Sequence, residues 1–236
     1  MNSPAGTPLI LFDIDGTLVR RAGPHHRQAL VDAVRAITGL DTTTEGIPVQ
    51  GMLDPDILNV MMRMAGASGP GVRQAMPRII RRAETVYLRT CPDLTRKTCP
   101  GVRAVLRKLQ SRGAVFVLVT GNLTRIGWKK LASAGLKQYF RYGAFGEMAK
   151  DRAGLARLAI RHSREQGWIG RDAPVTLIGD APADILAAQA NGIQSIAVRT
   201  GISTEEELQS CAPSILLNDL RELRWSMIRD GRSAHS

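Results

Sequence analysis

Two aspartates separated by a single residue follow an apolar stretch near the start of the chain. Asp13 and Asp15 come directly after residues 9–12, four consecutive apolar residues that predict a buried strand. Alternate side chains of a strand point to the same side, so both carboxylates would face one small volume. Two close carboxylates are stable only when a cation lies between them or one is protonated. The pair therefore suits a Mg²⁺ site, or a carboxylate nucleophile beside a proton donor.

Gly16 and Thr17 complete this short motif. Glycine permits a sharp exit from the strand, and the threonine hydroxyl can bond to the loop backbone. The same residue types are common in ordinary surface turns, so these residues taken alone leave a plain turn as the alternative. The residues further along the chain favour a functional site.

Two more apolar stretches end in polar residues. Residues 114–119 and 175–178 predict buried strands, and helical patterns lie between the strands. Uninterrupted apolar strands that alternate with helices predict a doubly wound α/β fold with a parallel sheet. Ligands bind at the carboxyl ends of such strands, so we expect the polar residues there to converge with the first motif. These residues are Thr120, Gly121, Asn122, Asp180 and Asp184.

A long insertion separates the first two predicted strands. A strand–helix–strand unit takes about 30 residues, whereas roughly 100 lie between these strands. The surplus has a helical pattern and predicts a cap domain that excludes water and selects the substrate. We expect the cap over residues 21–97 and the core over residues 1–20 and 98–236. The predicted cap helices cover residues 25–38, 54–66 and 72–90, with a break at 69–71.

Together these motifs resemble the haloacid dehalogenase superfamily of hydrolases. Residues 13–17 match the pattern D-x-D-G-T, Thr120 matches the second motif, and residues 179–184 match G-D-x-x-x-D. The insertion resembles the helical cap of phosphoglycolate phosphatases and β-phosphoglucomutases. In having an acid at position 15, the chain resembles the members of the superfamily that act on phosphate. Dehalogenases have a non-acidic residue at that position and need no metal.

The resemblance implies a role for each acid of the site. Asp13 would be the nucleophile and form an aspartyl-phosphate. Asp15 would protonate the leaving oxygen and then take a proton from the hydrolytic water. Mg²⁺ would be held by Asp13, the backbone carbonyl of Asp15, and Asp180. Asp184 would support these ligands or reach the metal through water.

The resemblance also implies phosphate-binding groups and one cation. Thr120 and the backbone N–H groups of Gly121 and Asn122 would hold phosphate oxygens at a helix start. Two residues could supply the cation of the third motif. Lys150 lies about where the lysine of a K-P-x-P motif would be, but the prolines are missing, and Arg152 resembles the D-R pair of some phosphoglycolate-phosphatase-like members. We favour Arg152 and keep Lys150 as the alternative, and either could be a surface charge.

Three cap residues are candidates for weaker reasons. Residues 51–54 resemble a G-x-T-D substrate loop whose middle positions are apolar here, so Asp54 either faces the substrate or caps a helix. His25 and His26 lie where the chain enters the cap, and we expect a solvated pair rather than substrate contacts.

The charge of the chain bears on its partners. The 236 residues carry a formal net charge of +11, but no lysine- or arginine-rich run with stacking aromatics stands out. We therefore expect a solvated basic surface and a small phosphorylated metabolite as partner, not nucleic acid. A nucleotide or a nucleic-acid end is another substrate that this charge would suit. The sequence leaves the oligomeric state open.

The cysteine spacing and the hydropathy of the chain indicate in which cellular compartment we expect the protein. The three cysteines match no metal-binding spacing, and no secretion signal or membrane-length apolar stretch stands out. We therefore expect a cytoplasmic protein with reduced thiols and no membrane partner.

The predicted function is a Mg²⁺-dependent phosphatase that hydrolyses a small phosphomonoester through an aspartyl-phosphate. One alternative is a phosphotransferase or sugar-phosphate mutase on the same fold, which passes the phosphoryl group to a sugar hydroxyl. The other is a basic nucleic-acid-binding protein with an inactive site, which salt-dependent binding would reveal.

Overall fold

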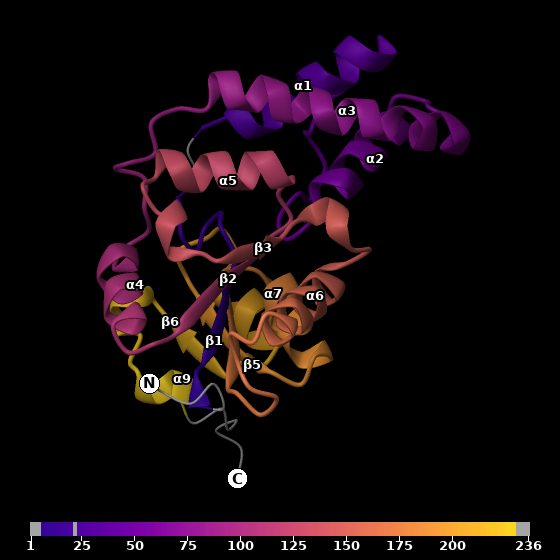
Figure 1. Cartoon of the computed structure of the whole chain (residues 1–236). Helices are drawn as coiled ribbons and strands as arrows, with labels where there is room; N and C mark the ends of the chain where they lie inside the picture. The colour runs from indigo at the N-terminus through magenta and orange to yellow at the C-terminus, as the bar shows by residue number, and fades with distance from the viewer. Residues whose placement is uncertain (1–5, 21–22, 230–236) are drawn as a thin grey trace.

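The computed structural model describes residues 6–20 and 23–229 and contains one six-stranded parallel sheet (Figure 1). The strand order is β3-β2-β1-β4-β5-β6, so β1 lies in the middle of the sheet. Phe12 at the end of β1 pairs with Leu118 of β2 and Ile178 of β4, so the carboxyl ends of three strands meet at one edge. The strands are β1 Leu9–Phe12, β2 Val115–Val119, β3 Tyr142–Ala144, β4 Val175–Gly179, β5 Gln194–Val198 and β6 Ile215–Leu217.

Helices cover both faces of the sheet. Ile10 and Phe12 of β1 pack in one hydrophobic cluster with α4 and α5, and Leu9 and Leu11 pack in the other with α6 and α7. This alternation explains why β1 is apolar at every position. The doubly wound α/β fold is therefore confirmed. The core helices are α4 Val102–Gln110, α5 Thr124–Ser133, α6 Arg152–Glu165, α7 Pro182–Ala190, α8 Glu205–Ser210 and α9 Ser226–Arg229, and the short 3₁₀ segments are η2 Lys137–Tyr139, η3 Gly146–Met148 and η4 Leu220–Glu222.

Three helices of the insertion, α1 His25–Thr38, α2 Asp54–Met64 and α3 Gly69–Thr90, form a separate layer. Figure 1 shows α1 and α3 above α5, on the side where the sheet edge with the strand ends lies. Their buried residues form a cluster of their own, which Leu123 and Ile126 of the core extend. The cap thus packs on the start of α5, while its division from the core at residues 20/21 and 97/98 stays a prediction.

The predicted position of one break in the cap, at residues 69–71, is wrong. Residues 69–71 were expected to interrupt the chain because of their glycines and proline, but α3 begins at Gly69. The Ser68 hydroxyl accepts the N–H of Gly71 at 3.2 Å and caps the helix. Pro70 lies in the first turn, where a missing N–H costs no helical hydrogen bond.

Candidate active site

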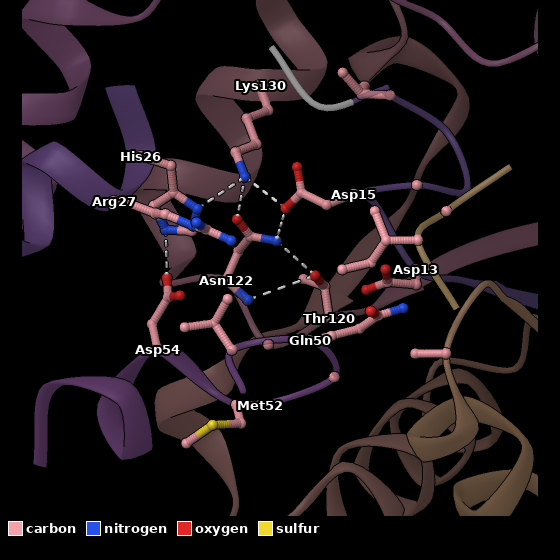
Figure 2. Close-up of a pocket in the computed structure, with 18 of the residues that line it drawn as sticks. Asp13, Asp15, His26, Arg27, Gln50, Met52, Asp54, Thr120, Asn122 and Lys130 are labelled. Atoms are coloured by element: carbon pink, nitrogen blue, oxygen red, sulfur yellow. Dashed lines mark hydrogen bonds and ion pairs between the residues drawn. The ribbon is translucent and has the colours of Figure 1, made fainter. Parts of the chain in front are cut away.

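A cavity of about 700 Å³ lies between the strand ends and the cap (Figure 2). Its walls come from both parts of the chain, because residues of the β1, β2 and β4 ends face residues of α1, α2 and the loop before α2. The core contributes Asp13, Asp15, Gly16, Thr120, Gly121, Asn122, Lys130, Arg152 and Asp180, and the cap contributes His26, Arg27, Gln50, Met52, Asp54 and Tyr87. The structure therefore brings together residues that are far apart in the sequence.

Three buried carboxylates form what we call the acidic cluster. Asp13, Asp180 and Asp184 each place one carboxylate oxygen within 4.8 Å of the others. Burial, reinforced by the neighbouring carboxylates, raises the pKa of Asp180 well above its usual value. Burial also raises the pKa of Asp184, to about 7, although Arg152 opposes the shift. Such a group of oxygen donors is short of positive charge, and its chemistry fits a hard divalent cation such as Mg²⁺.

Gly16 and Thr17 support this cluster. The Thr17 hydroxyl donates to Asp180 at 3.1 Å and orients that carboxylate. Gly16 has a positive φ of 85°, and a Cβ at this position would collide with the Asp180 carboxylate. Only glycine therefore allows the chain to turn this close to Asp180.

Arg152 is the cation of the acidic cluster. Its Nη1 donates to Asp13 Oδ1 at 3.0 Å and to Asp184 Oδ1 at 2.8 Å, and the side chain is 8% exposed. Its buried Nε–H has no acceptor among the described residues. Lys150, the alternative, is exposed and does not line the cavity. The geometry thus favours Arg152 over Lys150 for the role of the third-motif cation.

The loop between β2 and α5 presents Thr120, Gly121 and Asn122 to the cavity. Asn122 Nδ2 donates to Thr120 Oγ1 and to Asp15 Oδ2, at 2.8 Å in both cases. Because the Thr120 oxygen accepts, its hydroxyl proton is free to be donated to a phosphate oxygen. Gly121 lies against the backbone of Met52, whose carbonyl a Cβ would strike, so the cap loop docks directly on the loop between β2 and α5.

Asp54 does not cap its own helix, contrary to one of the two expectations, because Leu53 takes that position. The Asp54 carboxylate is buried and accepts the N–H of Leu123, at the start of α5, at 2.8 Å. It also lies 2.9 Å from His26 Nε2. The prediction of a solvated histidine pair is therefore wrong for His26, although Asp54 remains a lining residue that could face a substrate.

Lys130 is a buried site residue that the sequence patterns did not single out. It is 4% exposed, and its Nζ lies 2.5 Å from Asp15 Oδ2, 2.6 Å from Asn122 Oδ1 and 3.1 Å from His26 Nδ1. We call Lys130, Asp15, Asn122, His26 and Asp54 the lysine network. A signal was present, because Lys130 follows the buried Ile126 by one helical turn and so occupies a position of α5 that faces inward.

The lysine network sets the state of Asp15. Burial pushes the pKa of Asp15 up, but the Lys130 ammonium and the hydrogen bonds from Lys130 and Asn122 outweigh burial and hold that pKa below its usual value. Both hydrogen-bond partners of its side chain bind Oδ2, so among the described residues Oδ1 has none. Asp15 is therefore a carboxylate with one oxygen held and the other open to the cavity.

Comparison with known proteins agrees with this geometry. The family model described as "Hydrolase: haloacid dehalogenase-like hydrolase" matches residues 7–192, so the chain belongs to this family of hydrolases. The expected resemblance and the expected enzyme class, a hydrolase, are confirmed. Of the described helices, none combines the length and the hydropathy that crossing a bilayer requires.

Among similar curated proteins are two phosphoglycolate phosphatases. That of Caulobacter vibrioides is 27% identical over 91% of this chain and 88% of its own length. That of Pseudomonas putida is 24% identical over 91% of this chain and 78% of its own length. These relatives match the chain across both the core and the cap.

Solved structures share the fold at lower identity. CbbY from Rhodobacter sphaeroides, a complex with xylulose-(1,5)bisphosphate, has a TM-score of 0.72 and 19% identity over 94% of this chain and 99% of its own. β-Phosphoglucomutase from Clostridium difficile has a TM-score of 0.69 and 15% identity over 95% of this chain and 96% of its own. At these identities the likeness concerns the fold alone.

Proposed function

We propose that this hydrolase is a Mg²⁺-dependent phosphatase that cleaves a small phosphomonoester through an aspartyl-phosphate on Asp13. The observation that carries the proposal is the acidic cluster around Asp13, with Arg152 bound to it and the Thr120 hydroxyl on the same cavity wall. The names of the curated relatives support a phosphatase.

The hydrogen bonds of Asp13 indicate which atom reacts. Arg152 holds Oδ1 at 3.0 Å, which leaves Oδ2 to attack phosphorus. As the Oδ2–P bond forms, the ester P–O bond breaks and the leaving oxygen takes a proton from Asp15. A bound phosphoryl dianion would help Asp15 to carry that proton, because a nearby like charge raises the pKa of a carboxyl group and so counters Lys130. Water then attacks phosphorus and Asp15 takes its proton, while the Oδ2–P bond breaks. Asp13 is restored as a carboxylate, and inorganic phosphate leaves.

Three acids and one carbonyl would hold the metal: Asp13, Asp180, Asp184 and the backbone oxygen of Asp15. The ion would supply positive charge beside the phosphoryl oxygens. Thr120 and the N–H groups of Gly121 and Asn122 would bind the same oxygens from the start of α5. Arg152 would keep Asp13 in place and balance part of the charge that the substrate adds.

Activity measurements test this proposal directly. The chain would be assayed against a panel of phosphorylated metabolites, with 2-phosphoglycolate first because of the relatives' names, with and without Mg²⁺. We expect phosphate release that excess chelator abolishes and added Mg²⁺ restores. Turnover that survives excess chelator would refute the metal, and no turnover on any phosphomonoester would refute the phosphatase.

A phosphotransferase or sugar-phosphate mutase is the second candidate. One observation favours it, since the cap carries an acid–base pair, His26 and Asp54, that lines the cavity. However, both ring nitrogens of His26 are already bound, Nδ1 to Lys130 and Nε2 to Asp54, which leaves neither for a sugar hydroxyl. Time-resolved product analysis with a sugar acceptor separates the two, because a mutase yields an isomeric sugar phosphate in place of inorganic phosphate.

A further inference from the structure

Lys130 makes as many hydrogen bonds as its ammonium can donate. Its three acceptors are Asp15 Oδ2, Asn122 Oδ1 and His26 Nδ1. Lysine has no acceptor, so Asn122 must present its oxygen and His26 its unprotonated Nδ1. His26 then carries its proton on Nε2 and donates it to Asp54. One buried ammonium thus fixes the hydrogen-bond directions of the whole lysine network.

The partners of Lys130 come from both parts of the chain. Asp15 and Asn122 follow core strands, whereas His26 belongs to α1 of the cap and is held by Asp54 of α2. Tyr87 of α3 adds a second cap contact, with its ring centre 5.9 Å from Nζ. Figure 2 shows Lys130 between His26 on one side and Asp15 on the other. The ammonium finds its full set of partners only when the cap lies on the core.

The arrangement matters for catalysis because of what it does to Asp15. Lys130 and Asn122 both bind Oδ2, and Asp15 has a side chain that is 38% exposed toward the cavity. The rotation of the carboxylate is therefore fixed, and Oδ1 is the oxygen that can reach a substrate. Without Lys130, Asp15 would keep only the amide of Asn122 and could turn away from the leaving oxygen.

We propose that Lys130 is a positioning residue for Asp15, and that its bond to His26 makes the alignment of the acid–base group depend on cap closure. The inference rests on the proposed phosphatase function, in which Asp15 protonates the leaving oxygen. Lys130 forms no hydrogen bond or ion pair with Asp13, Asp180 or Asp184, so its role is separate from holding the metal or the nucleophile.

The test compares two phosphate esters that differ in their need for a proton. An alkyl phosphate such as 2-phosphoglycolate releases a strongly basic alkoxide that needs the proton of Asp15. p-Nitrophenyl phosphate releases a stable phenolate that does not. For Lys130→Met we expect kcat/KM to fall about 100-fold on the alkyl ester and only about threefold on the nitrophenyl ester. A merely structural role would lower both values equally.

Lys129→Met is the matched control, because Lys129 is the same residue type at the next position of α5 and does not line the cavity. It should leave both substrates unaffected. Lys130→Ala extends the test, since a short primary alkylamine should restore its alkyl-ester activity in a saturable manner. Equal losses on the two esters, or no rescue by the amine, would overturn the positioning role.

His26→Leu tests the dependence on the cap. It removes the acceptor for the third N–H of Lys130 and should produce the same substrate dependence, with a smaller loss of about tenfold on the alkyl ester. Unchanged selectivity between the esters in this variant would refute the coupling to cap closure. The alkyl ester used is one that the wild-type protein hydrolyses among the phosphorylated metabolites. If the wild-type protein releases phosphate from no phosphomonoester, the proposed function fails, whereas active wild-type protein with an equally active Lys130→Met variant refutes only this inference.

Discussion

Two groups of ionisable side chains lie at the same cavity and offset the energetic cost of burial in different ways. In the acidic cluster, Asp13, Asp180 and Asp184 have one guanidinium between them, and the pKa values of Asp180 and Asp184 are raised. In the lysine network, Asp15 shares Lys130 with neutral partners, and its pKa is lowered. Burial raises the pKa of Asp15, Asp180 and Asp184 alike, so the number of nearby cations and hydrogen-bond donors decides the net direction of each shift.

The difference indicates what each group requires. The acidic cluster is short of positive charge, so the binding of a divalent cation there should raise the free energy of unfolding of the protein. The lysine network is complete, because each hydrogen of the ammonium already has an acceptor. We therefore expect the acidic cluster to respond to metal and to pH near neutrality, and the lysine network to respond to neither.

Asp13→Asn should have the largest effect. The amide is a poor nucleophile, so we expect kcat to fall at least about a thousandfold. The fold should remain, because the amide keeps the size of the carboxylate and removes one negative charge from a crowded cluster. Phosphate release and circular dichroism would be measured together. Turnover close to that of the wild type would refute covalent catalysis by Asp13.

Arg152→Met should reduce both activity and stability. Its removal leaves buried carboxylates without their cation, which costs about 3–5 kcal/mol in the free energy of unfolding without metal. We also expect turnover to drop about 100-fold, since Asp13 loses the donor that orients it. Lys150→Met is the matched control and should change little, because Lys150 is exposed. The reverse result, with Lys150 required and Arg152 dispensable, would exchange their roles.

Mg²⁺ should stabilise the protein through the acidic cluster alone. At one hundred times its dissociation constant, a ligand specific for the folded state adds about 2.7 kcal/mol to the free energy of unfolding. Thermal unfolding with increasing Mg²⁺ would show this gain in the wild type and in Asp54→Asn, which alters the lysine network. Asp180→Asn should lose most of the shift. An equal loss of the Mg²⁺-dependent shift in both variants would refute the claim that Mg²⁺ stabilises the protein through the acidic cluster alone.

The smallest expected effect is a pH dependence of the metal-free protein. Asp180 and Asp184 have raised pKa values in the folded state, the latter about 7 against an ordinary 3.8. Their contribution to stability is present in acid and is lost as the pH rises through about 7. Melting temperatures should therefore fall by a few degrees between pH 5 and pH 8 without metal. Saturating Mg²⁺ should remove the decline, and a metal-free protein that becomes steadily more stable over this range would contradict the shifts.

The residues of the three motifs that match the superfamily pattern all follow strands. Asp13, Thr120 and Asp180 come directly after apolar stretches, and parallel pairing brings the carboxyl ends of β1, β2 and β4 to one edge of the sheet. Their convergence therefore follows from local hydrophobic pattern and from the topology that such a pattern favours. The cap could also be foreseen from the length of helical pattern between two strands, although its contacts could not.

The sequence by itself determined the sheet, its helical layers and the row of acids at the strand ends, because these depend on the period and order of apolar residues. The tertiary structure alone decided that Arg152 and not Lys150 reaches Asp13, and that Lys130 and His26 meet at Asp15. The physical reason is that the reach of a long side chain on a helix depends on which face of the helix packs inward and on what lies across from it. Those distances arise only when α1, α2 and α5 come together.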